Sequence, residues 1–244
     1  MPSAILLCAG KGSRLLPLTN KKPKCLIPVL GKPIIKWEIE LLDDLGIENV
    51  HIITGYKEDM IKDYIESHIW KDSISTWNNQ FDIKFIHQEK QTGTADAIFL
   101  AKDVIDKEFL VLSGDTIFLK EDVKRLMKQN NSFLYTKQHE RLHEYGTIEF
   151  NEESDTIIKR IHEKETKPVS HFVNCGAYHF DEKIFKYIPK TLVDERFKER
   201  IITNTINLML EKKIQFHGIY TDNLYEITYP KDIQEVERKL NEKK

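Results

Sequence analysis

A stretch rich in glycine and positive charge, CAGKGSRLLPLTNKKP, occupies residues 8–23 of this 244-residue chain. Its glycines allow backbone N–H groups to approach an anion closely. Arg14 and the following Lys24 can form charge-assisted hydrogen bonds with phosphate oxygens. The apolar run at residues 3–8 predicts a buried strand directly before the loop. The pattern indicates either a loop that binds a polyphosphate or a plain basic surface turn.

The spacing of the glycines excludes two common nucleotide-binding loops. A dinucleotide fingerprint needs a third glycine at position 15, where this chain has Leu15. A Walker loop needs the pattern GxxxxGK[ST], which residues 8–23 do not contain. The glycines alone therefore leave both interpretations open.

Strands and helices that alternate along the first half of the chain must position this loop. This order predicts an α/β fold whose doubly wound, mostly parallel sheet is flanked by helices, in a single domain over residues 1–244. Residues 70–79 are polar and are expected to form a surface excursion. The expected strands are 3–8, 49–54, 81–87, 108–115, 145–150, 156–163 and 172–180, and the expected helices are 33–45, 57–69, 94–102, 201–213 and 230–244.

Polar loops follow three of the expected strands. They span residues 9–24, 88–94 and 114–115. Ligands of doubly wound sheets bind at the carboxyl ends of the strands, near the point where the strand order reverses. We therefore expect the three loops to meet around one ligand.

Composition narrows the classes of function. Thirty-seven Lys and Arg residues against 39 Asp and Glu give a net charge of −2, which does not favour binding of duplex nucleic acid. The early apolar run is too short to cross a membrane, and no signal peptide is recognisable. Three cysteines without a CxxC pair indicate reduced thiols, and the nine histidines lack the spacing of zinc ligands. These features predict a cytoplasmic protein without nucleic-acid or membrane partners.

Residues 6–35, LLCAGKGSRLLPLTNKKPKCLIPVLGKPII, resemble the opening signature of the sugar-1-phosphate nucleotidyltransferases, LxAGxGxRLxPLTxxxPKxLxPVxGKPxI. The resemblance implies a GT-A-like sheet and a nucleotide held by the loop through Ala9, Gly10 and Gly12. It also implies that Arg14 and Lys24 bind the triphosphate and the leaving pyrophosphate.

Two further segments match this family in order. Residues 88–97, QEKQTGTADA, resemble the base-reading pattern QxxxxGTxxA, which implies that Gln88 reads a pyrimidine edge beside Gly93 and Thr94. An amide that caps the next helix is the alternative for Gln88. Asp115 ends the VLSGD segment, where the family binds the catalytic Mg²⁺, and an Asx-turn is its alternative.

Three short segments of the second half resemble the family's acceptor site. Gly146 belongs to EYGTIEF, close to the sugar in the family. Glu163 and Lys164 belong to IHEKETKP, which implies contacts with the sugar and with its phosphate. Asn174 and Gly176 belong to VNCGAYHF, which implies a hydrogen bond to a sugar hydroxyl and a close approach of the ligand. A strand asparagine in a purely structural hydrogen bond is the alternative.

The late segment NLYEITYPKDIQEVE departs from the family pattern. Glu226 stands where most members place a second metal-binding aspartate, and Tyr229 stands where a small residue is usual. Glutamate can still bind Mg²⁺ through oxygen. The Tyr-Glu-Ile sequence at 225–227 and the PKCL sequence at 23–26 resemble the choline-phosphate cytidylyltransferase branch. The identity of the acceptor therefore stays open.

The resemblance implies a Mg²⁺-dependent enzyme that transfers a nucleoside monophosphate from a nucleoside triphosphate, with a pyrimidine base, to a sugar-1-phosphate. The alternatives are a cytidylyltransferase for phosphocholine or another non-sugar phosphate, and a catalytically silent ligand-binding homologue. A GT-A glycosyltransferase would need a DxD-like metal motif, and residues 114–116 offer one carboxylate. The left-handed β-helix and the acetyltransferase of some relatives are not expected, and the oligomeric state is left open.

Overall fold

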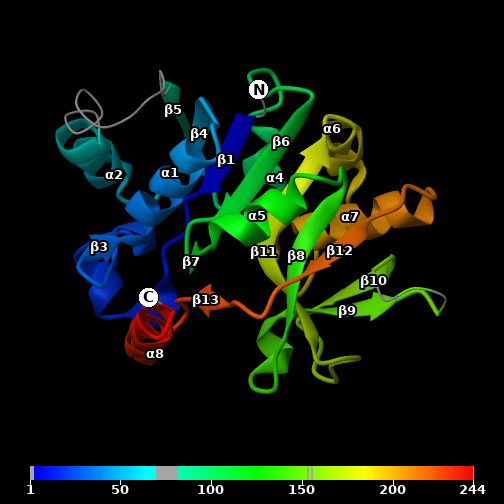
Figure 1. The fold of residues 1–244 in the computed structure, drawn as a ribbon. Coiled ribbons are helices and arrows are strands. Elements are labelled where there is room, and N and C mark those ends of the chain that lie inside the picture. Colours follow the sequence, from blue (N-terminus) through cyan, green and yellow to red (C-terminus); the bar gives the residue numbers. More distant parts are fainter. Residues whose placement is uncertain (1–2, 70–81, 153, 155, 244) are drawn as a thin grey trace.

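A computed structural model describes residues 3–69, 82–152, 154 and 156–243 (Figure 1). The excursion expected at 70–79 lies outside the described residues. The main sheet runs in the order β12-β8-β11-β6-β1-β4-β5, and the β9–β10 hairpin joins it through β11. Its strands are β1 (Ser3–Leu7), β4 (Asn49–Thr54), β5 (Asp82–His87), β6 (Glu108–Ser113), β8 (Ser132–Lys137), β9 (Gly146–Phe150), β10 (Ile158–Glu163), β11 (Phe172–Asp181) and β12 (His217–Tyr220).

The sheet is mixed but mostly parallel, as expected. β1 pairs in parallel with β4 and β6, β4 with β5, and β12 with β8. β11 lies antiparallel between β8 and β6. Because the chain passes from β1 to β4 and β5 and then returns to β6 on the other side of β1, the strand order reverses at β1 and β6.

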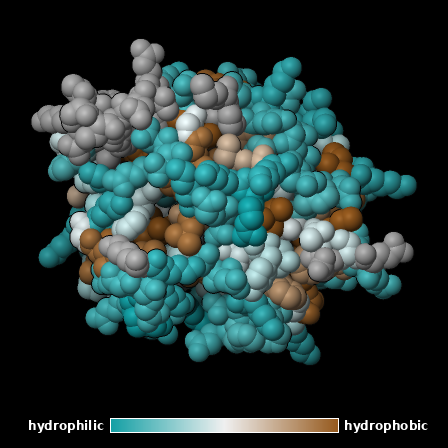
Figure 2. Space-filling model, viewed as in Figure 1, coloured by the Kyte–Doolittle hydropathy of each residue, from teal (hydrophilic) through white to brown (hydrophobic). Residues whose placement is uncertain are grey.

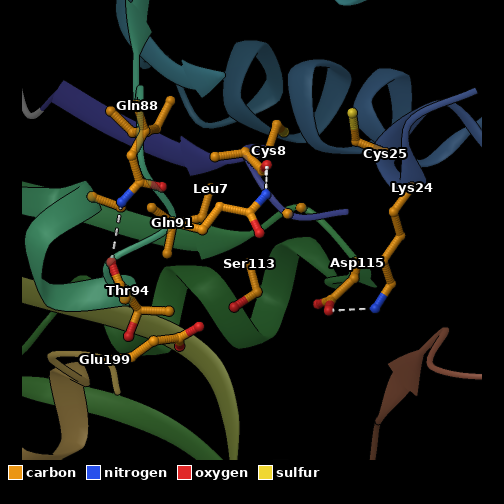
Figure 3. A pocket seen from close by; sticks show the side chains of 16 residues that line it. Leu7, Cys8, Lys24, Cys25, Gln88, Gln91, Thr94, Ser113, Asp115 and Glu199 are labelled. Atoms are coloured by element: carbon orange, nitrogen blue, oxygen red, sulfur yellow. Dashed lines mark hydrogen bonds and ion pairs between the residues drawn. The ribbon is translucent and has the colours of Figure 1, made fainter. Parts of the chain in front are cut away.

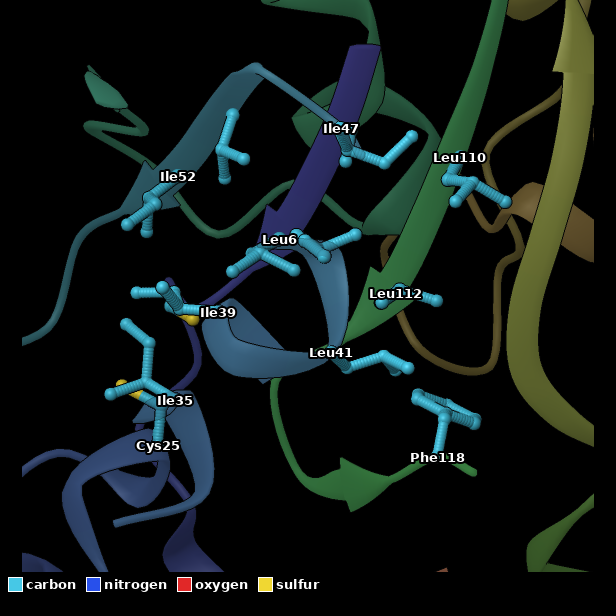
Figure 4. Close-up of a cluster of buried hydrophobic side chains, with 14 of the residues drawn as sticks. Leu6, Cys25, Ile35, Ile39, Leu41, Ile47, Ile52, Leu110, Leu112 and Phe118 are labelled. Carbon is cyan, nitrogen blue, oxygen red and sulfur yellow. The ribbon is translucent and has the colours of Figure 1, made fainter. Parts of the chain in front are cut away.

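Apolar side chains on both faces of the sheet explain why helices cover both. Ala4 and Leu6 of β1 point into one core, which α1 (Ile34–Asp44), α2 (Glu58–Tyr64) and α5 (Lys120–Leu126) cover. Ile5, between them, points into the other core under α4 (Thr94–Phe99), α6 (Ile184–Tyr187) and α7 (Ile202–Glu211). Figure 4 shows the first core, where Leu6, Leu110 and Leu112 of the sheet face Ile35 and Ile39 of α1.

A third, smaller core joins the C-terminal segment to residues 15–34. The C-terminal helix α8 (Pro230–Asn241) packs there against the hairpin of β2 (Pro28–Val29) and β3 (Lys32–Pro33), and beside β7 (Thr116–Ile117) and β13 (Tyr225–Glu226) (Figure 1). Leu15 of the glycine-rich loop is fully buried in this core. The loop therefore rests on α8.

Several boundaries differ from the expected ones. α2 ends at Tyr64 and passes into a π-helical turn, η4 (Ile65–Ile69), whereas one helix over 57–69 was expected. α4 ends at Phe99, and β6 ends at Ser113, so residues 114–115 form a turn. The elements β8, β12, α5 and α6 were not predicted from the sequence. β12 and α6 have only four residues each, which is too few for a clear hydrophobic period.

The described part of the chain contains no helix that is both long and apolar enough to cross a membrane. Figure 2 shows a face that is mainly hydrophilic, with hydrophobic residues in patches between polar ones.

Glu58 at the start of α2 ties this helix to the sheet. Its carboxylate accepts hydrogen bonds from Lys62 at 2.7 Å and Thr54 at 2.8 Å and contacts His87 at 2.5 Å. The hydrogen bond from Lys62, helped by those from His87 and Thr54, outweighs burial and lowers the pKa of Glu58 to about 2. Since the pKa is lowered in the folded state, this stabilisation is present above the ordinary value of 4.5 and is lost as the pH falls towards 2.

We expect Glu58→Gln to lower the free energy of unfolding at pH 7 by about 1 kcal/mol. Urea unfolding at pH 7 and at pH 3 measures the effect, and the difference from wild type should shrink at the lower pH. Glu121→Gln is the control, because Glu121 also lies in the first turn of a helix but is 80% exposed in its ion pair. A loss that does not depend on pH would contradict the electrostatic explanation.

Candidate active site

Two adjoining cavities lie at the carboxyl ends of β1 and β6, where the strand order reverses. The first, which we call the Gln88 cavity, has a volume of about 220 Å³. The second, the Glu163 cavity, has a volume of about 590 Å³. The residues that line both are Thr94, Ser113, Asp115 and Glu199. The three loops predicted to meet do so here.

The two cavities divide the predicted site residues between them. Ala9, Gly10, Lys24, Gln88, Gly93, Thr94 and Asp115 line the Gln88 cavity. Arg14, Thr94, Asp115, Gly146, Glu163, Lys164, Asn174, Gly176 and Glu226 line the Glu163 cavity. Gly12 alone among the predicted residues lines neither.

Gly12 packs against Thr19 and Lys24 within the glycine-rich loop. Its backbone is left-handed, with φ of 61°, and a Cβ there would lie 2.9 Å from Cγ2 of Thr19 and 3.2 Å from Cβ of Lys24. The Thr19 hydroxyl donates a hydrogen bond to the Gly12 carbonyl at 2.9 Å. A side chain at position 12 would therefore push Lys24 out of place.

Amide side chains form one end of the Gln88 cavity (Figure 3). Gln88 is 8% exposed, and its amide nitrogen donates to the carbonyl of Gly93 at 3.3 Å. The Gln91 amide donates to the Ala9 carbonyl at 2.9 Å, which ties the loop at 9–24 to the loop at 88–94. Gly93 has φ of 117°, and a Cβ there would lie 2.2 Å from the carbonyl oxygen of Arg200. The close approach of the Arg200 backbone explains why residue 93 is a glycine.

Lys24 and Asp115 form an ion pair at the other end of this cavity, with 2.6 Å between Nζ and Oδ2 (Figure 3). Lys24 begins the short helix η3 (Lys24–Leu26), and Asp115 occupies the turn between β6 and β7. Burial opposes ionisation of Asp115, but the charge and hydrogen bond of Lys24 outweigh it and lower the pKa of this carboxyl. Asp115 is therefore an anion at neutral pH.

Backbone pairing brings Glu226 close to the turn that carries Asp115. Glu226 of β13 lies opposite Thr116 of β7, and the amide of Ile227 donates to the Asp115 carbonyl at 2.9 Å. Burial, followed by the charge of Asp115, raises the pKa of Glu226. The Tyr145 hydroxyl is hydrogen-bonded to the Glu226 carboxyl.

The carboxylates of Asp115 and Glu226 are suitable ligands for Mg²⁺. The charge of Asp115 disfavours ionisation of Glu226, and a cation between the two carboxylates would relieve this repulsion. Mg²⁺ is commonly bound by one or two carboxylates together with phosphate oxygens and water. Within the described residues no group of three or more His, Cys, Asp and Glu is arranged to hold a metal by itself. Asp115 and Glu226 thus fit a metal that arrives with a phosphorylated ligand.

Glu163 ends β10, Lys164 follows it, and both line the Glu163 cavity. Glu163 is 8% exposed and accepts a hydrogen bond from the Thr203 hydroxyl at 2.9 Å. Its Oε2 lies 2.9 Å from the position of a Cβ at residue 146, so Gly146 is needed for this packing. The ammonium of Lys164 lies 3.5 Å from Oε1 of Glu163 and 5.3 Å from the ring centre of Phe197.

Asn174 and Gly176 form an irregularity in β11. The register with β8 shifts between Asn174 and Tyr178. The Asn174 amide oxygen accepts from the Gly176 N–H at 3.1 Å, and its nitrogen donates to the Tyr178 hydroxyl at 2.5 Å. A Cβ on Gly176 would lie 2.4 Å from Oγ of Ser113. These contacts bend the strand where it lines the cavity.

Other lining residues carry chemistry that the motifs did not indicate. Arg196 lines the Glu163 cavity, and its guanidinium lies 5.0 Å from the centre of the same Phe197 ring that Lys164 approaches. Glu199 lies where the two cavities meet. The charged run DERFKER at residues 194–200 was the available signal, but a charge run usually marks a solvated surface.

Comparisons with known proteins point to the same family that the sequence motifs resemble. The model of the nucleotidyl transferase family matches residues 3–235. The bifunctional protein GlmU of Methanocaldococcus jannaschii is 36% identical over 244 residues, covering 98% of this chain and 54% of that protein. The UTP–glucose-1-phosphate uridylyltransferase AglF of Haloferax volcanii is 31% identical over 249 residues, covering 98% of this chain and 96% of that protein. This chain therefore spans about half the length of the GlmU protein.

A solved structure shares the fold. The crystal structure of a UDP-glucose pyrophosphorylase with UDP-glucose superimposes with a TM-score of 0.84 at 22% identity, and both chains are covered completely. This likeness confirms the expected α/β sheet with helices on both faces.

Proposed function

The chain belongs to the nucleotidyl transferase family, and we propose that it transfers a nucleoside monophosphate from a pyrimidine nucleoside triphosphate to a sugar-1-phosphate. The observation that carries this proposal is the position of Asp115, which pairs with Lys24 in the wall shared by two cavities. One cavity ends in the amide of Gln88, and the other ends in Glu163 and Lys164. A donor and an acceptor that meet at Asp115 would place the two phosphates beside each other.

In the proposed reaction, an oxygen of the acceptor phosphate attacks the α-phosphorus of the triphosphate. The bond from this phosphorus to the bridging oxygen breaks, and pyrophosphate leaves with the bonding electrons. The attacking oxygen is already an anion, so no general base is needed. The barrier comes from repulsion between two polyanions and from charge that develops on the leaving group, and cationic groups lower it.

Each cation has a proposed partner. Lys24 from the Gln88 cavity and Arg14 from the Glu163 cavity, which share Asp115, bind the triphosphate and the leaving pyrophosphate. Lys164 binds the acceptor phosphate, whereas Arg196, which approaches the same Phe197 ring, is already paired with Asp194 at 2.8 Å. Gly10 borders the Gln88 cavity, and a Cβ there would meet no protein atom within 4 Å, so there is room for a phosphate beside its backbone.

Asp115 and Glu226 are the residues that would hold Mg²⁺. When bound, the ion would neutralise phosphate charge and polarise the α-phosphoryl group. The protein itself contributes the turn after β6 and the β7–β13 pairing, which keep the two carboxylates side by side.

The proposed base preference rests on Gln88. One amide offers both a donor and an acceptor, which matches a pyrimidine edge. We expect Gln88→Leu to lower kcat/KM for the preferred pyrimidine triphosphate by about 10- to 100-fold, the loss of one or two hydrogen bonds. Gln215→Leu is the control, since Gln215 is exposed and lies outside both cavities.

The deciding experiment measures pyrophosphate release with Mg²⁺ across the common nucleoside triphosphates and a panel of sugar-1-phosphates, phosphocholine and polyol phosphates. Turnover with pyrimidine triphosphates and a sugar-1-phosphate is expected. Activity with purines alone would overturn the assignment of Gln88. No release with any pair would favour a silent ligand-binding homologue.

For the acceptor, a sugar-1-phosphate fits the Glu163 cavity better than phosphocholine does. Glu163, Thr203 and Asn174 give the Glu163 cavity carboxylate, hydroxyl and amide groups, which pair with the hydroxyls of a polyol. Turnover with phosphocholine and CTP in the same panel, with none for sugar-1-phosphates, would support the cytidylyltransferase instead.

A further inference from the structure

Tyr229 links the C-terminal helix to the mouth of the Glu163 cavity. It is the N-cap of α8, and its hydroxyl donates a hydrogen bond to Oε1 of Glu144 at 3.0 Å. The other carboxylate oxygen of Glu144 lies 3.8 Å from Nη1 of Arg14. One carboxylate is therefore shared between a tyrosine of α8 and the arginine of the glycine-rich loop.

The two contacts of Glu144 are unequal. The distance to Tyr229 is that of a hydrogen bond, whereas 3.8 Å to Arg14 exceeds the usual 2.7–3.2 Å for N–H···O. The Glu144 side chain is 16% exposed, and that of Arg14 is 49% exposed and lines the cavity. Glu144 thus keeps Arg14 nearby without occupying its guanidinium donors.

Tyr229 is itself held firmly in place. The guanidinium of Arg141 lies 5.2 Å from the centre of its ring, within the range of a cation–π contact. Arg141 also pairs with Asp232 at 3.3 Å, and Asp232 accepts a hydrogen bond from the Tyr229 N–H at 2.8 Å. Because Asp232 is 3% exposed, this closed set of contacts fixes the phenol against α8.

We propose that Tyr229 is a positioning residue that restrains Glu144 and so keeps Arg14 available for the triphosphate. The inference rests on the proposed role of Arg14 in triphosphate binding. Without the phenol hydroxyl, both oxygens of Glu144 would be free to pair with the guanidinium. Arginine and carboxylate form strong two-point pairs, and such a pair would compete with the phosphate oxygens.

The test is a double-mutant cycle between Tyr229→Phe and Glu144→Gln, read by initial rates and by calorimetric binding of the triphosphate with Mg²⁺. Tyr229→Phe should raise KM and Kd for the triphosphate about threefold to tenfold, the range for one hydrogen bond, with little change in kcat. In the Glu144→Gln background the same substitution should have no effect, because the neutral amide does not compete for Arg14. A merely structural tyrosine would cost the same in both backgrounds.

Tyr220→Phe is the matched control. Its hydroxyl also donates to a carboxylate, Asp222 at 2.8 Å, but neither residue lines the two cavities, and no change in KM is expected. An unchanged KM and Kd in Tyr229→Phe, or an equal rise in both backgrounds, would overturn the inference. If wild type binds the triphosphate without turnover, the proposed function fails and the binding cycle still decides this inference. If wild type binds no triphosphate, both fail.

Discussion

Replacing Asp115 with alanine is expected to lower kcat by about 10³-fold or more while the chain stays folded. The loss is large because Asp115 lies in the wall common to both cavities, where the donor and acceptor phosphates would meet. The fold should survive, because the side chain stands on a turn and is 30% exposed rather than packed in a core. Pyrophosphate release and thermal unfolding measure the two effects.

A surface pair offers the control for this variant. Asp44 lies 3.6 Å from Lys120 and is 64% exposed, so Asp44→Asn removes an aspartate–lysine pair far from the cavities. It should leave turnover within about twofold of wild type, as expected for a surface change. Near-normal activity of Asp115→Ala would refute the proposed metal role.

Replacing Lys24 with methionine is expected to lower kcat/KM for the triphosphate by about 10²- to 10³-fold. Methionine keeps most of the side chain's length but removes the charge that faces the cavity. The melting temperature should fall by a few degrees, because Asp115 loses the ammonium that lies 2.6 Å away. Initial rates, together with calorimetric titration of inorganic pyrophosphate, separate catalysis from anion binding.

The partner of the same surface pair serves as the control for Lys24. Lys120→Met removes a lysine that is 38% exposed and pairs with Asp44. It should change neither pyrophosphate binding nor turnover. If Lys24→Met binds pyrophosphate as well as wild type does, the assignment of Lys24 to the triphosphate is wrong.

The order of strands and helices could be predicted where the hydrophobic pattern is long. The apolar run at 3–8 and the apolar residues 109–112 predicted two buried strands, and the structure pairs them as neighbouring parallel strands. Short elements such as β12 and α6 could not be predicted, since four residues carry no resolvable period. Element ends were predicted less well, as at α2, where the helix changes to a π-helical turn.

The residues of the candidate site could likewise be predicted only in part. Signature motifs predicted roles for Lys24, Gln88, Asp115 and Glu163, and all four line the cavities. They did not indicate Arg196 or Glu199, which lie in an irregular charged loop that borders the cavities only after folding. They explained Gly93 by its approach to the base, whereas in the structure the backbone of Arg200, more than 100 positions along the chain, requires a glycine there.

By itself, the sequence determined the family, the alternation of strands and helices, and the residue types that the chemistry needs, because these depend on local pattern and spacing. Tertiary structure alone decided which of those residues face each other. The pairing of β13 with β7 places Glu226 beside Asp115, and α8 places Tyr229 against Glu144 and Arg14. These contacts join segments separated by 85 or more positions, and only packing of the whole chain brings them together.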